Sequence, residues 1–176
     1  LDITLGNINN CFSLGELNFF VENGILKNEF CSCGSRVLEC PFWGSVVLKW
    51  NKVRRLSDNL FINTQYKLLR NKRFLLNLIL KPSYYEDYLH DVTKLYDIIF
   101  DESGYDILID SSKNGNYIKA LKKINHKIEV VHLIRSFYSR YKTSRKHLKF
   151  NPALGIERDV KPMSFYYALF TWLLDN

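Results

Sequence analysis

The sequence predicts an α/β fold, in which helices flank a parallel sheet, and three observations lead to this class. Residues 105–109 and 128–134 are short apolar runs with β-branched residues, and the stretch between them, 116–123, has helical character. Strand, helix and strand in this order indicate parallel strands joined by a crossover helix. A further short strand is expected near the start of the chain, at 11–14.

The first third of the chain is divided by glycine, asparagine and proline. Residues 1–8 resemble the end of a helix, and the turn at Asn9 and Asn10 follows it. Residues 29–41 contain three cysteines, a glycine and a proline, which is typical of an irregular loop. We expect a helix to begin after this loop, at about 42–50.

The middle of the chain is expected to be a helical insertion or lid. Residues 56–80 have plausible helical spacing, and 84–103 form the clearer helix, which Gly104 ends. In that second helix, apolar residues recur every three or four positions, at Tyr88, Leu89, Val92, Leu95, Tyr96, Ile99 and Phe100. After the second β-branched run, a basic helix is expected within 135–149.

Length and composition indicate a single globular domain over residues 1–176. Of the 176 residues, 47% are apolar, and neither a repeat nor a flexible linker divides them. No apolar run approaches the roughly 20 residues of a membrane span, and the first residues lack the pattern of a secretory signal. We therefore expect no transmembrane segment and a cytoplasmic location. The oligomeric state is not predicted.

The net charge of +7 is concentrated in one segment. Residues 113–149 contain eleven lysines and arginines and one acidic residue, whereas the rest of the chain has a net charge of −3. Such a segment favours a polyanionic partner, which can be a phosphate, a sulfate or a nucleic acid.

Polar and basic residues follow both β-branched runs, where ligands bind in parallel α/β sheets. Asp110, Ser111, Ser112 and Lys113 follow the first run, and backbone N–H groups, hydroxyls and an ammonium there suit a phosphate or sulfuryl group. The alternative is that a serine only caps the next helix. Arg135 follows the second run, which should be mostly buried, and its guanidinium can hold a phosphate with two hydrogen bonds.

Glu16 lies at the end of the early strand, in the segment SLGEL. A carboxylate in this position could take a proton from an acceptor hydroxyl as a general base. A solvent-exposed glutamate without a catalytic role is the alternative interpretation.

Cys31, Cys33 and Cys40 have the spacing C-x-C-x6-C, which does not match the usual zinc patterns with four ligands. Three interpretations stay open: structural thiols, which we favour, a disulfide, or a zinc site. The four histidines have no metal-binding spacing, and neither a Walker-type phosphate loop nor a dinucleotide-binding glycine motif is present.

Four segments together resemble a known family. SLGEL with the aromatics after it, CSCG…CPFW, ILIDSSK, and VVHLIR with the basic helix occur in the order and at the intervals of sulfotransferases that use 3′-phosphoadenosine 5′-phosphosulfate (PAPS). The resemblance is greatest to the bacterial group related to carbohydrate and tyrosylprotein sulfotransferases. It implies a three-layer parallel sheet flanked by helices, like that of P-loop NTPases, with a helical insertion.

The resemblance also implies roles for individual residues. Arg135 and Thr143 match residues that bind the 3′-phosphate of the donor, Lys113 matches a lysine near the transferred sulfuryl group, and Glu16 matches the catalytic base. The family's R-S-G-[ST]-T loop, which binds the 5′-phosphosulfate, is not in the sequence, so we expect a chain truncated before Leu1. We also expect that the C-terminal end of the family's domain is missing after Asn176.

The implied function is transfer of a sulfuryl group from PAPS to a hydroxyl of a small molecule or glycan, with a sugar as the first candidate. This chemistry requires no metal, because side chains supply the positive charge, and no nucleic acid is expected as a partner. Two alternatives remain from the residues alone. The basic helix with Phe137, Tyr138 and Tyr141 could bind nucleic acid, or the chain could be related to nucleotide kinases.

Overall fold

The computed structural model describes residues 2–70, 83–123, 127–132, 136–144, 148–151, 156–159 and 164–169. The chain divides into two compact units, Leu1–Ile128 and Glu129–Asn176, and each is described by itself. Among these residues, no helix combines the length and the apolar character that crossing a bilayer requires.

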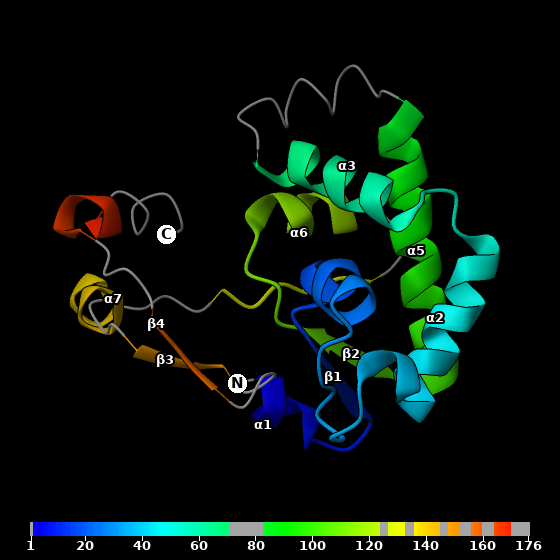
Figure 1. Cartoon of the computed structure of the whole chain (residues 1–176), viewed down its shortest axis with the longest axis horizontal. Helices are drawn as coiled ribbons and strands as arrows, with labels where there is room; N and C mark the ends of the chain where they lie inside the picture. Colours follow the sequence, from blue (N-terminus) through cyan, green and yellow to red (C-terminus); the bar gives the residue numbers. More distant parts are fainter. Residues whose placement is uncertain are drawn as a thin grey trace. The chain divides into compact units, whose positions relative to one another are not determined.

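The first unit contains most of the helices and a parallel pair of strands (Figure 1). In chain order, its elements are α1 (Asp2–Gly6), β1 (Cys11–Gly15), the 3-10 turn η1 (Leu17–Phe19), the π-helix η2 (Phe20–Leu26), the 3-10 turn η3 (Val37–Glu39), α2 (Pro41–Val53), α3 (Asp58–Arg70), α5 (Ser83–Ser103), β2 (Ile107–Asp110) and α6 (Gly115–Leu121). The expected early strand, the helix after the cysteine-rich loop and the long helix before Gly104 are therefore confirmed.

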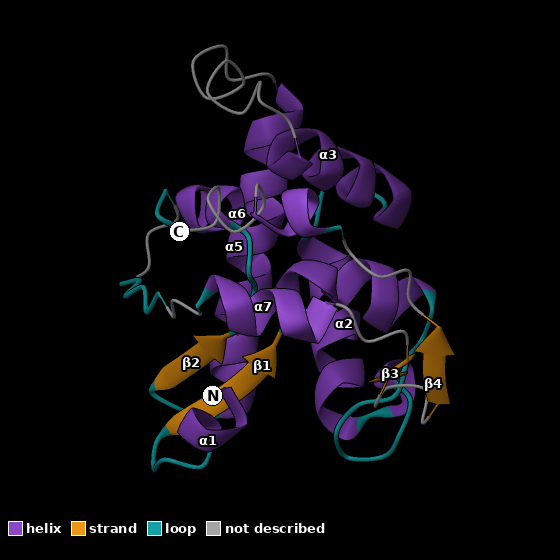
Figure 2. Ribbon diagram, turned by 90° about the vertical axis from the view of Figure 1, so that its left-hand side faces the viewer, coloured by secondary structure: helices purple, strands orange, loops and turns teal. Residues whose placement is uncertain are grey.

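Strands β1 and β2 pair in parallel, although 91 residues lie between the end of β1 at Gly15 and the start of β2 at Ile107. Cys11 lies opposite Ile107, and Gly15 lies opposite Asp110 after a register shift. Figure 2 shows the two arrows side by side and pointing in the same direction. Helices α2, α3 and α5 lie between the two strands in the sequence, as parallel pairing requires. The mixed helix-and-strand class is confirmed in this form.

The prediction of a second strand at 128–134 is wrong for the part that the structure describes. Residues 127–132 have no regular structure, and Val130 and Val131 are 44% and 73% exposed rather than buried. Residues 133 and 134 lie outside the described residues. A β-branched run becomes a strand only where a neighbouring strand completes its hydrogen bonds, and the described partner of β2 is β1, from upstream in the chain.

The core of the first unit is formed largely by α2 and α5, which also lie side by side in Figure 1. Trp50 of α2 and Tyr88 and Ile99 of α5 are fully buried. The apolar spacing of α5 accordingly places one face of the helix in the core, at Tyr85, Tyr88, Val92, Leu95 and Ile99. The described part of the expected insertion, α3 and α5, therefore contributes to the core of this unit and does not form a separate lid.

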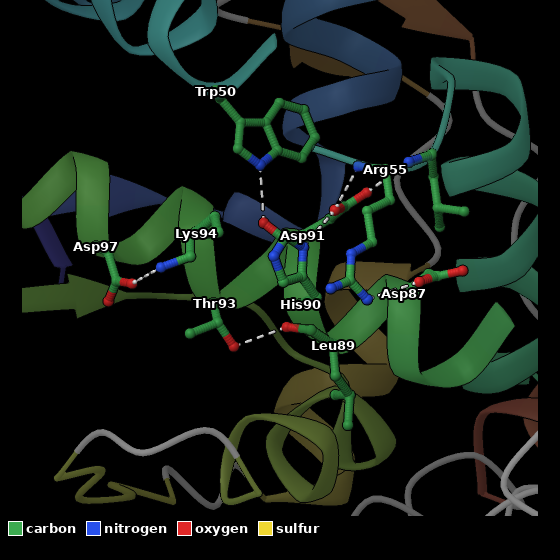
Figure 3. Close-up of polar contacts among 10 residues, drawn as sticks. Trp50, Arg55, Asp87, Leu89, His90, Asp91, Thr93, Lys94 and Asp97 are labelled. Carbon is green, nitrogen blue, oxygen red and sulfur yellow. Dashed lines mark hydrogen bonds and ion pairs between the residues drawn. The ribbon is translucent and has the colours of Figure 1, made fainter. Parts of the chain in front are cut away.

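A buried carboxylate joins α5 to the turn between α2 and α3 (Figure 3). The Asp91 side chain is fully buried and accepts hydrogen bonds from the backbone N–H groups of Arg55 and Leu56, both at 2.8 Å. The Trp50 indole N–H donates to the backbone carbonyl of Asp91 at 2.8 Å. These bonds fix the start of α3 against α5 and satisfy polar groups that burial would otherwise leave without partners.

The second unit contains α7 (Phe137–Ser144) and an antiparallel pair, β3 (Leu148–Asn151) and β4 (Ile156–Asp159). The expected basic helix is thus present as α7, but it is shorter than expected, because β3 begins at Leu148, within the range 135–149 that was expected to contain the helix. Phe137 and Tyr141 lie one helical turn apart and stack at 6.0 Å between ring centroids, and each packs edge-on against Phe165. These two rings contribute to the packing of the second unit itself, which weakens the interpretation of α7 as an exposed aromatic surface for nucleic acid.

Candidate active site

The carboxyl ends of β1 and β2 lie next to each other, because the strands are parallel and pair to their last residues. Gly15 ends β1 with a φ of +67°, in the left-handed region that favours glycine, so the chain can turn sharply there. The backbone N–H of Ser111 donates to the Gly15 carbonyl at 2.8 Å, which extends the contact past the last strand residues. Glu16 and Lys113 are placed by the two loops that leave this edge.

Glu16 and Lys113 form an ion pair across the two loops. The Lys113 Nζ donates a hydrogen bond to Glu16 Oε1, although 97 residues separate the two in the sequence. The side chain of Lys113 is 77% exposed and that of Glu16 is 36% exposed, so solvent reaches both groups. Two residues assigned separately from the sequence are therefore brought together. An ammonium has three donors, which leaves capacity for an anion in addition to Glu16.

Asp110, the last residue of β2, holds the loop after β1 and the loop after β2 together through hydrogen bonds. Its carboxylate accepts from the backbone N–H of Ser112 at 2.8 Å and of Leu17 at 3.4 Å. It also accepts from the Ser112 hydroxyl, which itself accepts from the backbone N–H of Asn18 at 3.1 Å. Through these bonds, one carboxylate fixes the loop after β1 and the loop after β2. The sequence identified Asp110 only as part of the strand end.

Two tyrosines lie close to Asp110, of which Tyr117 is buried and Tyr96 is half-buried. The Tyr96 hydroxyl donates to Asp110 Oδ2, and the hydroxyls of Tyr96 and Tyr117 are 3.3 Å apart. Burial is the main cause that raises the pKa of both phenols well above the ordinary value, and the nearby Asp110 adds to the effect. Both groups therefore stay neutral and can act as hydrogen-bond donors. The spacing in the sequence placed Tyr96 on the apolar face of its helix, but nothing indicated a role for Tyr117 or the contact of Tyr96 with Asp110.

The residues after β2 differ from the expectation in how they use their backbone. The cap of α6 is Asn114, whose side-chain oxygen accepts from the backbone N–H groups of Asn116 at 2.9 Å and Tyr117 at 3.1 Å. Neither Ser111 nor Ser112 caps the helix, and both of their own N–H groups are used within the protein. The positive charge of Lys113, rather than a set of open N–H groups, is what this loop offers to an anion.

A small, open hollow of about 20 Å³ begins two residues after Glu16, and η1, η2 and α3 contribute to its lining. The residues that line it are Asn18, Phe19, Glu22, Ile62, Gln65 and Tyr66. The amide N–H of Gln65 donates to the Asn18 carbonyl, and the Tyr66 hydroxyl donates to Glu22. Asn18 Oδ1 is buried without a hydrogen-bond partner in the described part of the chain, which is unusual for a buried oxygen.

The residues matched to the donor's 3′-phosphate belong to the second unit. Arg135 lies outside the described residues, so the structure does not place its guanidinium. Thr143 lies near the end of α7. The argument that placed Arg135 directly after a buried strand is not supported, because residues 127–132 are irregular. Its assignment therefore depends on the resemblance alone.

Comparison with known proteins adds no family to this description. No protein-family model, curated protein or solved structure matches the chain.

Proposed function

We propose that this protein is a sulfotransferase, which transfers a sulfuryl group from PAPS to an acceptor hydroxyl. The observation that supports the proposal most is the pairing of Glu16 with Lys113 at the carboxyl ends of two paired parallel strands. Both residues match functional positions of the family that the sequence resembles. A ligand site at this edge is also what α/β sheets favour in general. The proposal includes a P-loop-NTPase-like three-layer fold with a helical insertion at 56–103.

The described side chains fit the sulfuryl end of the donor. Glu16 would take the proton from the acceptor hydroxyl while the acceptor oxygen forms its bond to sulfur. The bond between sulfur and the bridging phosphate oxygen breaks, and Lys113 would neutralise the negative charge that develops on that oxygen. The proton thus ends on Glu16, and the electron pair of the broken bond stays with the phosphate. Asp110 would act as a positioning residue, since it holds both loops.

The hollow that begins at Asn18, two residues after Glu16, is our candidate for the acceptor side. Asn18 lines it, and its side-chain oxygen has an unused capacity to accept a hydrogen bond in the described part of the chain. Gln65 and Tyr66 add further polar groups to the same lining. Several polar side chains that can hydrogen-bond to hydroxyl groups line one small hollow, which suits a sugar. We therefore test a carbohydrate acceptor first.

The donor's 3′-phosphate is assigned to Arg135 and Thr143 from the resemblance. The first test is therefore calorimetric binding of 3′-phosphoadenosine 5′-phosphate and of AMP, which lacks the 3′-phosphate, to the whole protein with any residues that precede Leu1. We expect the 3′-phosphorylated nucleotide to bind far more tightly. Arg135→Ala should weaken its binding by about 1.5–3 kcal/mol, the range for a hydrogen bond to a charged group.

The matched control is Arg140→Ala, which removes a neighbouring positive charge that the sequence assigns to a solvated helix face. It should leave the binding of the 3′-phosphorylated nucleotide nearly unchanged. Equal affinities for the two nucleotides would contradict the donor assignment. Equal losses in the two variants would indicate a general charge effect instead of a phosphate site.

The catalytic assignment is tested with Glu16→Gln, which removes the base but keeps the size of the side chain. Turnover should fall by about 10²–10⁴, the usual contribution of a general base, with little change in the affinity for 3′-phosphoadenosine 5′-phosphate. Glu86→Gln changes an exposed glutamate of α5 and should leave turnover unchanged. Unchanged turnover in Glu16→Gln would place the base elsewhere.

A further inference from the structure

Three thiols converge in the loop that precedes α2. The Sγ atoms of Cys33 and Cys40 are 3.6 Å apart, those of Cys31 and Cys40 are 3.7 Å apart, and all three lie within 4.8 Å of one another. All four cysteines of the chain are free thiols, so the disulfide interpretation is wrong for this structure. Cys11, the fourth, is buried in β1.

The separations between the sulfurs match those of thiolates around one metal ion. Tetrahedral zinc binds cysteine sulfur at about 2.3 Å, which places two bound sulfurs about 3.8 Å from each other. The two shorter separations, 3.6 and 3.7 Å, are close to this value. A disulfide would require about 2.05 Å. The thiols therefore lie where a metal ion could bind all three with small side-chain adjustments.

The backbone, rather than contact between the sulfurs, holds this loop in shape. The Cys31 N–H donates to the Ser35 carbonyl at 2.8 Å, and the Gly34 N–H donates to the Cys31 carbonyl at 2.9 Å. Gly34 has a φ of +87°, which favours glycine, so the C-x-C-G order is what this tight turn needs. At the other end, the Cys40 N–H donates to the Arg36 carbonyl at 2.8 Å, and Cys40 caps α2.

The close approach of α2 to this loop depends on Gly44. A Cβ atom at position 44 would lie 2.8 Å from the backbone carbonyl oxygen of Leu38, a distance at which the backbone would have to shift. The Gly44 N–H also donates to the Cys40 carbonyl at 2.8 Å. The helix is thereby fixed against the turn that carries Cys40, which keeps this thiol in place.

The surroundings of Cys33 favour a negative charge on its sulfur, whereas burial acts in the opposite direction at Cys31. The backbone N–H of Ser35 donates to the Cys33 thiol, and with help from Cys31 and Cys40 this lowers its pKa to about 7. The backbone N–H of Cys33 in turn donates to the Cys31 sulfur, although burial is the larger effect there and raises the pKa of Cys31.

We propose that Cys31, Cys33 and Cys40 form a metal site that binds Zn²⁺ through three thiolates, with a water molecule as the fourth ligand. Thiolates are the ligands that zinc prefers, and three protein ligands with one open position form an established type of zinc site. Cys33 is exposed and gives an ion access, whereas Cys40 is buried and connects the site to the core. Binding would displace the thiol protons that remain at the working pH. The site does not depend on the proposed transferase activity.

The test is an anaerobic titration of the reduced, metal-free protein with Co²⁺, which reports thiolate ligands by a charge-transfer absorption, followed by displacement with Zn²⁺. We expect one Co²⁺ per chain, an absorption intensity that corresponds to three thiolates, and full displacement by one equivalent of Zn²⁺. Cys33→Ser should weaken the binding of Co²⁺ by about 100-fold or more, because it removes a direct ligand. The exposed position of Cys33 means that this variant should fold normally, which circular dichroism checks.

The matched control is Cys11→Ser, which removes the cysteine outside the cluster and should keep the absorption unchanged. Labelling with a thiol reagent in the presence of Zn²⁺ gives an independent readout, with protection of Cys31, Cys33 and Cys40. Equal Co²⁺ binding by the wild-type protein and Cys33→Ser would overturn the proposal. So would a reduced protein that takes up no Co²⁺ and on exposure to air forms a disulfide within the cluster.

Discussion

Two carboxylates of the first unit are used in opposite ways. Asp91 is fully buried, and its two oxygens accept backbone hydrogen bonds at 2.8 Å from Arg55 and Leu56. Glu16 is partly exposed and pairs with the still more exposed ammonium of Lys113. The comparison shows that a buried carboxylate whose bonds are complete can serve stability, whereas an exposed pair keeps capacity for a ligand.

Asp110 lies between these two cases. It accepts backbone N–H groups, as Asp91 does, but the loops that it fixes are those that carry Glu16 and Lys113. Its bond with Tyr96 connects the exposed edge to α5, the same helix that contains Asp91. The difference between the two regions can be measured, because changes at Asp91 should affect the free energy of unfolding, whereas changes at Glu16 and Lys113 should affect turnover.

The largest effect on stability is expected for Asp91→Ala. The change removes the acceptors of two backbone N–H groups, and leaving such groups without partners costs about 1–3 kcal/mol each. We therefore expect the free energy of unfolding to fall by about 2–6 kcal/mol, measured by urea denaturation. Asp87→Ala, one helical turn earlier, removes only an exposed ion pair with Arg55 and should cost less than about 1 kcal/mol. Similar losses in the two variants would show that burial does not distinguish these carboxylates.

An intermediate effect is expected at alkaline pH. Burial raises the pKa of Tyr96 and of Tyr117, so the folded state keeps protons that unfolded tyrosines release near pH 10. This contribution to stability is complete below about pH 10 and is lost as the pH rises above it. Each such tyrosine should lower the free energy of unfolding by about 1.4 kcal/mol between about pH 9 and pH 11.

Tyr96→Phe isolates this contribution. Urea denaturation at the two pH values should show a loss smaller by about 1.4 kcal/mol than in the wild-type protein. Tyr138→Phe, which removes an exposed hydroxyl in α7, is the control and should leave the loss as it is. An unchanged loss in Tyr96→Phe would mean that its hydroxyl is not held neutral in the folded state.

The smallest effect on stability is expected at the candidate active site itself. A double-mutant cycle with Glu16→Gln and Lys113→Met should give a coupling energy below about 1 kcal/mol, because exposed ion pairs contribute little. The measurement is urea denaturation of the two single variants and the double variant. A coupling above about 2 kcal/mol would place the pair with Asp91, as part of what holds the fold together.

The comparison also separates what could and could not be predicted from the sequence. The long helix α5 was predicted with nearly its boundaries and with most of its buried face, because period-3.6 spacing is a local signal, although Phe100 is exposed and Tyr85 is buried. Asp91 was not predicted, because nothing in its neighbourhood along the chain shows that it faces the turn at Arg55 and Leu56. The strand at 128–134 was expected from composition alone, although pairing with another strand is what forms a strand.

By itself, the sequence determined most α-helices and both strands of the first unit, the mixed helix-and-strand class, and Glu16 and Lys113 as separate candidates, but not the turns and the π-helix after β1. Only the tertiary structure decided that β1 is the partner of β2, that the two candidates meet, and that three cysteines gather within 4.8 Å. The physical reason is that helix periodicity and turn chemistry act between near neighbours in the chain. The pairing of distant strands and the contacts between loops depend on how the whole core packs.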